Sequence, residues 1–321
     1  MKPLFPKSLW SRDPDGWSAI DMQGGVFGVK VRLPKKEGAK PVVLQCVAYP
    51  GQAAEGAVLG QMARALSNGS HPVVALLGRH DYQMFLIDKP AVKPDEMESS
   101  LRLTVSPLMD YPMADANLAW LDVPARQTHG NRVPQVYVVV ARRSQVNACM
   151  ALFEKTKLSL QAVDIREAAQ RNIALLLQSK SAATCLVCAD ADGVQLTVTY
   201  KGDLYLVRFI SEVFFIRTEG GFQVREQVSE AVERLALEIQ RSFDFVRRNY
   251  PSITIDSLYV APTVAAIDLP AMLKASLVEE VKTLDLSDLF DFPQGSDLKK
   301  PAVQAQYFHA LGSALRMNIE G

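Results

Sequence analysis

The sequence predicts an α/β fold made of two similar lobes. Helical and strand patterns alternate along most of the 321 residues, which is typical of mixed sheets covered by helices. A unit of three short strands occurs twice, about half a chain apart, and each copy is followed by a helix and another strand. Two copies of one supersecondary unit indicate a duplicated protein in which each lobe has its own core.

The second copy has the clearer pattern and lies between Val163 and Ile210. Asp164, followed three residues later by Glu167, resembles a capping box, and apolar residues then recur at helical spacing. Strands follow in which apolar and polar residues alternate, separated by turns rich in Asp and Gly. The expected elements are a helix with Ile165, Ala169, Ile173 and Leu176 on one face, and strands at Cys185–Ala189, Val194–Tyr200 and Asp203–Ile210.

The first copy has the same order near the start of the chain. Asp21 stands where its first strand meets the turn Gln23-Gly24-Gly25, as Asp190 does in the second copy. The expected elements are strands at Ser18–Met22, Val26–Leu33 and Val42–Tyr49, a helix at Ala54–Leu66 and a strand at Val73–Leu77.

Further patterns complete the two lobes and predict a small subdomain between them. The remaining expected elements are a strand at Tyr82–Ile87, a helix at Glu96–Val105, a polar loop at Ala125–Arg132, a central strand at Val136–Val140, helices at Ser144–Lys157 and Val224–Arg248, a strand at Ser257–Val260, a helix at Leu269–Val281, a short strand at Leu284–Leu286 and a last helix at Val303–Leu315. The predicted division is a flexible leader at 1–16, a first lobe at 17–105 on which part of 303–321 packs back, an inserted subdomain at 106–160, and a second lobe with the terminal helix at 161–321.

Composition narrows the class of protein. Apolar residues make up 48% of the chain and charged residues 22%, with a formal net charge of zero. This is an ordinary globular composition, and it argues against a general nucleic-acid binder, which needs a basic surface. No stretch approaches 18 consecutive apolar residues, so no membrane span is predicted. The basic, partly apolar leader either touches an anionic membrane surface or frays, and we expect fraying.

Cysteines and histidines give no catalytic or metal pattern. Cys185 and Cys188 have C-x-x-C spacing, but on a strand their side chains point to opposite faces, which predicts buried thiols and suits the cytoplasm. The tripeptide Arg79-His80-Asp81 lacks a partner nucleophile, and adjacent side chains diverge. The remaining cysteines and histidines, which are scattered, are Cys46, Cys149, His71, His129 and His309.

Several stretches together resemble the actin-like ATPase superfamily and, within it, the PilM-like type IV pilus assembly proteins. They are WSAIDMQGGVFGVKV, DYPMADANLAWLDVP, VYVVVARRSQV, VDIREAAQRNIALLL, KGDLYLVRFI and ERLALEIQRSFDF, and their order carries the resemblance. The resemblance implies an actin-like fold of duplicated ribonuclease H-like lobes with an inserted FtsA/PilM-type small subdomain. It also implies a cytoplasmic scaffold of a type IV pilus of the mannose-sensitive haemagglutinin kind. Such a scaffold binds the cytoplasmic tail of a single-span, PilN-type inner-membrane protein.

Relatives in this superfamily bind ATP between the lobes, and two hairpin turns hold the phosphates. Gly and Ser or Thr let the turn backbone approach phosphate oxygens, and an Asp helps to hold Mg²⁺. In the first turn here Asp21 is present, Gln23 stands where Gly is expected, and Gly24 is followed by Gly25 near the missing hydroxyl.

The second turn departs further from the family pattern. Asp190 and Asp192 replace the usual Gly and Thr positions before Gly193, and without a metal two carboxylates repel phosphate. The segment Ala261-Pro262-Thr263-Val264 stands where a Gly-Gly turn would leave room for adenosine. These departures predict a degenerate phosphate site at Asp21, Gln23, Gly24, Gly25, Asp190, Asp192 and Gly193.

The sequence therefore favours a pseudo-ATPase scaffold with no catalytic residues and no resident metal. ATP with Mg²⁺ stays open as a ligand. The alternative is an ATP-binding ATPase or kinase relative in which a metal bridges Asp21 and either Asp190 or Asp192. A cytoplasmic domain of type II secretion ranks last, because such a domain normally precedes a transmembrane span. Self-association is left open.

Overall fold

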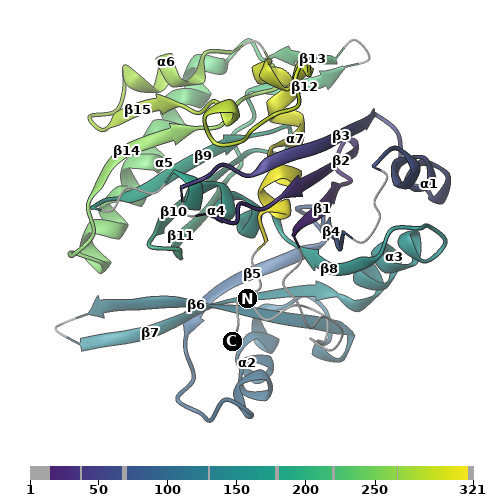
Figure 1. Cartoon of the computed structure of the whole chain (residues 1–321). Coiled ribbons are helices and arrows are strands. Elements are labelled where there is room, and N and C mark those ends of the chain that lie inside the picture. The colour runs from purple at the N-terminus through teal and green to yellow at the C-terminus, as the bar shows by residue number, and fades with distance from the viewer. Residues whose placement is uncertain are drawn as a thin grey trace.

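Two five-stranded sheets and one three-stranded sheet form the framework of the molecule (Figure 1). The computed structural model describes residues 15–36, 38–66, 71–128, 131–177, 181–218, 221–265 and 267–316, so most of the predicted leader and His129 lie outside the described residues. None of the helices in these ranges combines the length and the apolarity that a bilayer-spanning helix requires.

The first sheet has the strand order β3-β2-β1-β4-β8. β2 pairs antiparallel with β1 and β3, whereas β1, β4 and β8 run parallel. Helices α1 and α3 cover one face, where Leu59 and Phe153 join a cluster with Ile20 and Val73. The bounds are β1 (Gly16–Asp21), β2 (Gly25–Arg32), β3 (Val42–Pro50), β4 (Val73–Leu76), β8 (Leu160–Asp164), α1 (Gly56–Ala65) and α3 (Arg143–Glu154).

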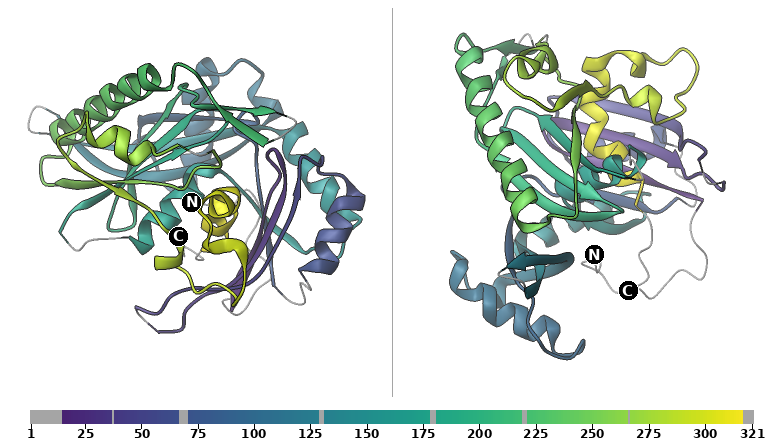
Figure 2. Two further views of the ribbon diagram at one scale, coloured as in Figure 1. Left: turned by 90° about the horizontal axis from the view of Figure 1, so that it is seen from above. Right: turned by 90° about the vertical axis from the view of Figure 1, so that its left-hand side faces the viewer.

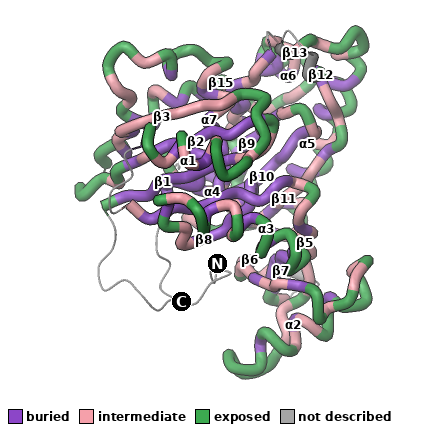
Figure 3. Tube along the Cα trace, turned by 90° about the vertical axis from the view of Figure 1, so that its right-hand side faces the viewer, coloured by how far each residue is buried: buried purple, intermediate pink, exposed green. Residues whose placement is uncertain are grey.

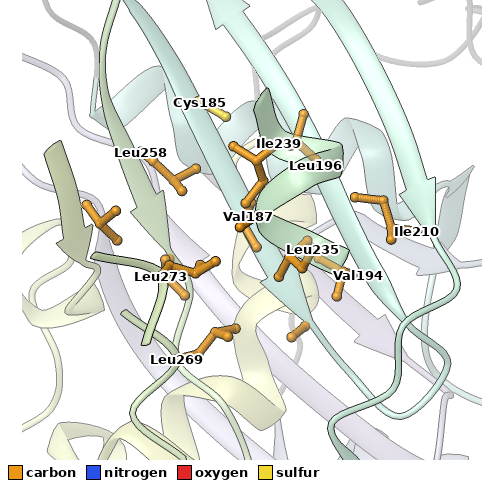
Figure 4. Close-up of a cluster of buried hydrophobic side chains, with 14 of the residues drawn as sticks. Cys185, Val187, Val194, Leu196, Ile210, Leu235, Ile239, Leu258, Leu269 and Leu273 are labelled. Carbon is orange, nitrogen blue, oxygen red and sulfur yellow. The ribbon is translucent and has the colours of Figure 1, made fainter. Parts of the chain in front are cut away.

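The second sheet repeats this topology with the strand order β11-β10-β9-β14-β15. β10 pairs antiparallel with β9 and β11, and β9, β14 and β15 run parallel. Its outer face packs under α5 and α6, with Leu235, Ile239 and Leu273 against the strand residues (Figure 4). The predicted duplication of an α/β unit is confirmed. The bounds are β9 (Ala183–Ala189), β10 (Val194–Tyr200), β11 (Asp203–Ile210), β14 (Ile255–Val260), β15 (Glu280–Thr283), α5 (Val228–Asn249) and α6 (Leu269–Lys274).

Helices α4 (Arg166–Leu176) and α7 (Pro301–Ala314) lie between the two large sheets (Figure 2). A single apolar cluster joins them to both sheets, and it contains Phe27 of the first sheet, Leu186 of the second and Phe308 of α7. The helices approach closely at Gly312, where an added Cβ would lie 2.3 Å from the Ala169 carbonyl oxygen. The inner faces of both sheets therefore share one core.

A small three-stranded sheet, in the order β5-β7-β6, projects from this body (Figures 1 and 3). Helix α2 packs on one face, where Leu101 and Val105 meet Val138. The other face touches β11, and the Val207 N–H donates to the Tyr137 hydroxyl at 3.0 Å. The bounds are β5 (Tyr82–Asp88), α2 (Met97–Val105), β6 (Ala116–Thr128) and β7 (Asn131–Arg142), and a separate hairpin consists of β12 (Phe215–Thr218) and β13 (Gly221–Val224).

The boundaries of the predicted division stay a proposal. β5 and α2, which the sequence analysis placed in the first lobe at 17–105, pair and pack within the small sheet. β8 follows the small sheet in the chain but completes the first sheet. Elements from both sides of residue 106 therefore build the small subdomain.

Several local predictions were wrong. The polar loop predicted at Ala125–Arg132 is mostly strand, because β6 and β7 continue as a ladder in which Arg126 pairs with Val133. The helix predicted at Leu269–Val281 ends at Lys274, and Glu280–Thr283 pairs with β14 instead. Leu284–Leu286 is not a strand, since a 3₁₀ turn begins at Leu286. For Glu280–Thr283, backbone pairing with the edge of β14 decided the assignment, as tertiary context does for weak local propensity.

The predicted capping box at the start of α4 was also wrong. The helix begins at Arg166 with Ile165 as its N-cap residue and no side-chain cap. Asp164 instead accepts a hydrogen bond from Arg316 at 2.6 Å. Glu167 points to a tyrosine, as described below. Both acids therefore form tertiary contacts rather than helix caps.

Candidate functional site

The first hairpin turn joins β1 to β2 and contains four of the predicted site residues. The Gln23 N–H donates to Asp21 Oδ1 at 3.0 Å, so the carboxylate closes its own turn. Gly24 and Gly25 have φ values of 66° and 149°, and a Cβ on Gly25 would lie 2.9 Å from the Pro50 backbone. Glycine is required here because a side chain would be both strained and blocked. The Asp21 side chain is only 6% exposed.

The second turn joins β9 to β10 and contains the other three. Asp190 Oδ1 accepts hydrogen bonds from the N–H groups of Asp192 and Gly193, at 2.8 and 3.1 Å. The Asp190 and Asp192 side chains are about one third exposed, at 31% and 34%. In both turns, N–H groups of the kind that would cradle a phosphate already donate to an aspartate of the same turn.

Arg166 brings the two turns together. It is the first residue of α4, and its side chain is only 7% exposed. The guanidinium donates a hydrogen bond to Asp190 Oδ2 through Nη1, and Nη2 lies 3.9 Å from Asp21 Oδ2. Asp192 Oδ2 is also 3.9 Å from Nη1. One buried cation therefore contacts carboxylates from both large sheets.

The charges in this cluster favour a permanently protonated arginine. Burial alone would lower the pKa of Arg166, but the carboxylates of Asp21, Asp190 and Asp192 outweigh it and raise that pKa. Unit charges about 4 Å apart attract by about 4 kcal/mol at an effective dielectric constant of about 20. Burial raises the pKa of Asp21, against the opposing effect of Arg166. One guanidinium faces three carboxyl groups, so the site holds no excess positive charge for phosphate.

A second buried contact lies beside the arginine. The Tyr82 hydroxyl at the start of β5 donates to Glu167 Oε2 at 2.5 Å. Burial raises the pKa of Glu167, while the tyrosine hydrogen bond opposes this increase. Arg79 stacks over the rings of Tyr82 and Phe209, with its Cζ 5.6 and 4.6 Å from the two centroids. Because Phe209 belongs to β11, Arg79 is a further link between the two sheets.

The tripeptide Arg79-His80-Asp81 borders this cluster without forming a catalytic set. Arg79 stacks as described, His80 is exposed, and Asp81 Oδ2 accepts a hydrogen bond from the Gly78 N–H at 3.0 Å. A Cβ on Gly78 would lie 2.4 Å from Gln23 Nε2. The Gln23 side chain therefore packs against this loop.

The segment predicted to crowd adenosine is packed against the second sheet. Ala261 and Pro262 are buried, and the Ala261 N–H donates to the Val187 carbonyl at 2.8 Å. The Thr263 hydroxyl donates to the Ala265 carbonyl at 2.9 Å. Side chains and not glycines occupy this stretch, and their effect on a nucleotide stays a prediction.

Other candidate groups do not assemble. Within the described ranges, no three His, Cys, Asp or Glu side chains are arranged to hold a metal ion. Cys185 and Cys188 lie in different apolar clusters, on opposite faces of β9 as predicted. His309 of α7 is buried, and burial together with Arg166 holds its pKa well below the usual value. It is therefore neutral near pH 7.

Sequence reasoning missed Arg166, Glu167, Tyr82 and Arg79. One available signal was the position of Arg166 in the first turn of a helix, where the macrodipole disfavours a cation unless acids lie close by. The stacking of Arg79 on Phe209 joins residues far apart in the chain, and no local pattern indicates it.

Comparisons with known proteins bear on the fold. No protein-family model matches the sequence, and no curated protein matches it. A chain of the "PilM-PilN type IV pilus biogenesis complex" superimposes with a TM-score of 0.70 at 17% identity, covering 94% of this chain and 99% of that one.

Two solved structures are more distant. The cytoplasmic domain of EpsL, an inner membrane component of the type II secretion system of Vibrio cholerae, has a TM-score of 0.46 at 10% identity, covering 90% of this chain and 94% of that one. A Bacteroides thetaiotaomicron protein with an actin-like ATPase fold has a TM-score of 0.47 at 10% identity, covering 86% and 93%. The chain has the actin-like fold that the sequence predicted, in a form similar to that seen in the PilM–PilN complex.

Proposed function

We propose that this protein is a scaffold of type IV pilus assembly that binds the cytoplasmic tail of a single-span, PilN-type inner-membrane protein. The observation that supports this most is the structural match to a chain of the PilM–PilN complex, over 94% of the sequence. The stretches quoted above favour, more finely, a scaffold of the MshI kind, which serves the mannose-sensitive haemagglutinin pilus. In this proposal the protein is cytoplasmic and reaches the inner membrane through its partner.

We further propose that the nucleotide site is degenerate. The turn N–H groups of Gln23, Asp192 and Gly193 donate to aspartate side chains. Arg166 contacts the carboxylates that would otherwise be available to Mg²⁺. A Mg-ATP complex would have to break these contacts and then face a carboxylate-rich site, which costs free energy on both counts.

The partner proposal is tested by binding. A fluorescent synthetic peptide with the sequence of the PilN-type protein's cytoplasmic tail is titrated with the full chain and followed by anisotropy. We expect saturable binding with a Kd of about 50 µM or lower, in the range of short-peptide recognition. A scrambled peptide is the control. No difference between the two peptides up to that concentration would contradict the scaffold role.

The second candidate function, an ATP-binding ATPase or kinase relative, is tested by thermal unfolding with Mg-ATP. A ligand that binds the native state must raise the melting temperature. We expect no saturable increase. An increase that is lost in Asp21→Ala would favour the enzyme, because Asp21 is the carboxylate that the metal-dependent alternative requires.

A further inference from the structure

The contact between α4 and the second sheet includes buried polar groups. Gln170 Nε2 donates to the carbonyls of Leu186 and Gln195, at 2.6 and 3.2 Å. The buried hydroxyls of Thr197 and Thr199 on β10 have no hydrogen-bond partner among the described residues. Buried polar atoms of this kind are commonly satisfied by ordered water. The contact between α4 and the second sheet therefore combines polar groups with the apolar cluster that contains Ile173 and Leu186.

The opposite side of α4 is close-packed. Ala169 lies against Gly312 of α7, and the Asn172 amide donates to the Gly312 carbonyl at 3.0 Å. α7 in turn packs against the first sheet through Tyr307 and Phe308, in the apolar cluster that both sheets share. The helix is thus joined to the first sheet through α7, and it packs on the second sheet through both polar and apolar groups.

We propose that Arg166 is a built-in electrostatic latch, in which one guanidinium on α4 ties the hairpin turn of the first sheet to that of the second. Its Nη1 contacts Asp190 and its Nη2 faces Asp21, so the two turns share one cation. The latch holds the sheets in one relative arrangement without a bound ligand. This inference rests on the proposed loss of the nucleotide, since the guanidinium occupies the space between the two turns.

A latch has consequences that a local ion pair lacks. If Arg166 joins the turns, a change at one turn must loosen the other, although their residues are far apart in the sequence. Asp190→Asn keeps the Oδ1 acceptor for Asp192 and Gly193 but removes the charge that holds the guanidinium. It should therefore loosen the turn at Asp21 to Gly25 as well as its own.

Hydrogen exchange by mass spectrometry on the full chain tests this. In Arg166→Gln we expect amides of both hairpin turns to exchange about tenfold faster or more, because local opening costs less free energy. In Asp190→Asn we expect faster exchange at Gln23 to Gly25 too. Arg166→Lys keeps the positive charge, but a single ammonium group cannot contact Asp21 and Asp190 at once as the two Nη atoms of a guanidinium do. This variant should therefore loosen one turn more than the other.

Arg171→Gln is the matched control. Arg171 lies on the same helix, but its Nε donates to the Gly202 carbonyl at 2.6 Å, at the turn between β10 and β11. Its loss should speed exchange at Lys201 and Gly202 and leave both hairpin turns unchanged. The latch is overturned if Asp190→Asn changes only its own turn, a result that can be read even where Arg166→Gln does not fold.

The exchange experiment tests the latch independently of the experiments that test the proposed function. The variants are compared by exchange without nucleotide, and the tail peptide is titrated against wild type independently. In a separate exchange measurement on wild type with Mg-ATP, protection of both turns would contradict the degenerate site. Coupled loosening of the turns in the variants would still establish the latch.

Discussion

The two hairpin turns that meet at Arg166 have the same backbone plan and different surroundings. In the first, Asp21 is buried, accepts one backbone N–H and lies 3.9 Å from the guanidinium. In the second, Asp190 is 31% exposed, accepts two backbone N–H groups and contacts the guanidinium directly. One carboxylate is short of hydrogen bonds and solvent, and the other has both.

This difference predicts that the two aspartates, although equivalent in position, have unequal effects on stability. Desolvation penalises a buried charge unless hydrogen bonds and an opposite charge offset it. Asp190 meets those conditions better than Asp21, and the raised pKa of Asp21 reflects its burial. Arg166 depends on both, because a lone buried guanidinium would be the costliest group of the three.

The largest effect is expected from removing the shared cation. Arg166→Met leaves Asp21 buried without its counter-charge and should lower the free energy of unfolding by about 3–5 kcal/mol. Urea unfolding followed by circular dichroism measures this. The control is Arg241→Met, since Arg241 is 60% exposed and pairs with Glu238 on the surface. A surface ion pair of this kind contributes about 0–1 kcal/mol to the free energy of unfolding. A loss at position 166 no larger than that of the control would contradict a buried role.

The shared backbone plan predicts the next largest effect. Gly25→Ala and Gly193→Ala should each cost about 2–3 kcal/mol, because both residues have φ near 149° and an added Cβ would meet backbone at 2.9 and 2.6 Å. Gly60→Ala in α1 is the control, with open space around the new methyl group. It should stabilise by about 0.5–1 kcal/mol. Urea midpoints test all three variants. If alanine is tolerated in only one of the two turns, the turns do not share a requirement for glycine.

Substitutions of the two aspartates should differ in their effect on the free energy of unfolding, by a smaller amount. Asp190→Asn loses a charge-assisted hydrogen bond and should cost about 1–2 kcal/mol. Asp21→Asn removes a poorly solvated charge and should change stability by less than about 1 kcal/mol. The two variants are compared by urea unfolding at pH 7. If Asp21→Asn proves the more damaging, the assignment of the two environments is reversed.

The smallest expected effect is a difference in pH dependence. The pKa of Asp21 is raised in the folded protein, so the native state holds this proton more tightly than the unfolded chain does. Its contribution to stability is therefore greatest below the unfolded value of 3.8 and is lost as pH rises through the folded pKa. Relative to Asp21→Asn, the wild type should lose stability as the pH rises above 3.8 through the raised pKa of Asp21. Parallel curves for the two proteins would show that Asp21 does not titrate as described.

The sequence predicted the parts of this site that local chemistry determines. Asp21 and Asp190 were placed at strand ends from turn signals, and the turn glycines followed from the same pattern. Alternating residues placed β10 correctly, and the opposite orientation of Cys185 and Cys188 followed from strand periodicity.

The remainder depends on contacts between distant segments. Arg166 was part of a recognised helix, but its reach to both turns follows from how α4 lies between the sheets. Glu167 and Asp164 fitted a capping box locally, and tertiary partners outcompeted that role. The short strand β15 exists because β14 offers an edge, which its own four residues do not reveal.

The position of α7 has a consequence for how the chain is made. This helix, near the end of the described residues, covers the inner face of the sheet that contains β1 and β2, and β8 completes the sheet only after the small subdomain. During synthesis the first three strands emerge with Phe27 and Val31 uncovered until α7 leaves the ribosome. Such long-range closure slows folding and leaves apolar strands open to aggregation. The inner face of the first sheet is therefore covered late in synthesis, when α7 docks on it.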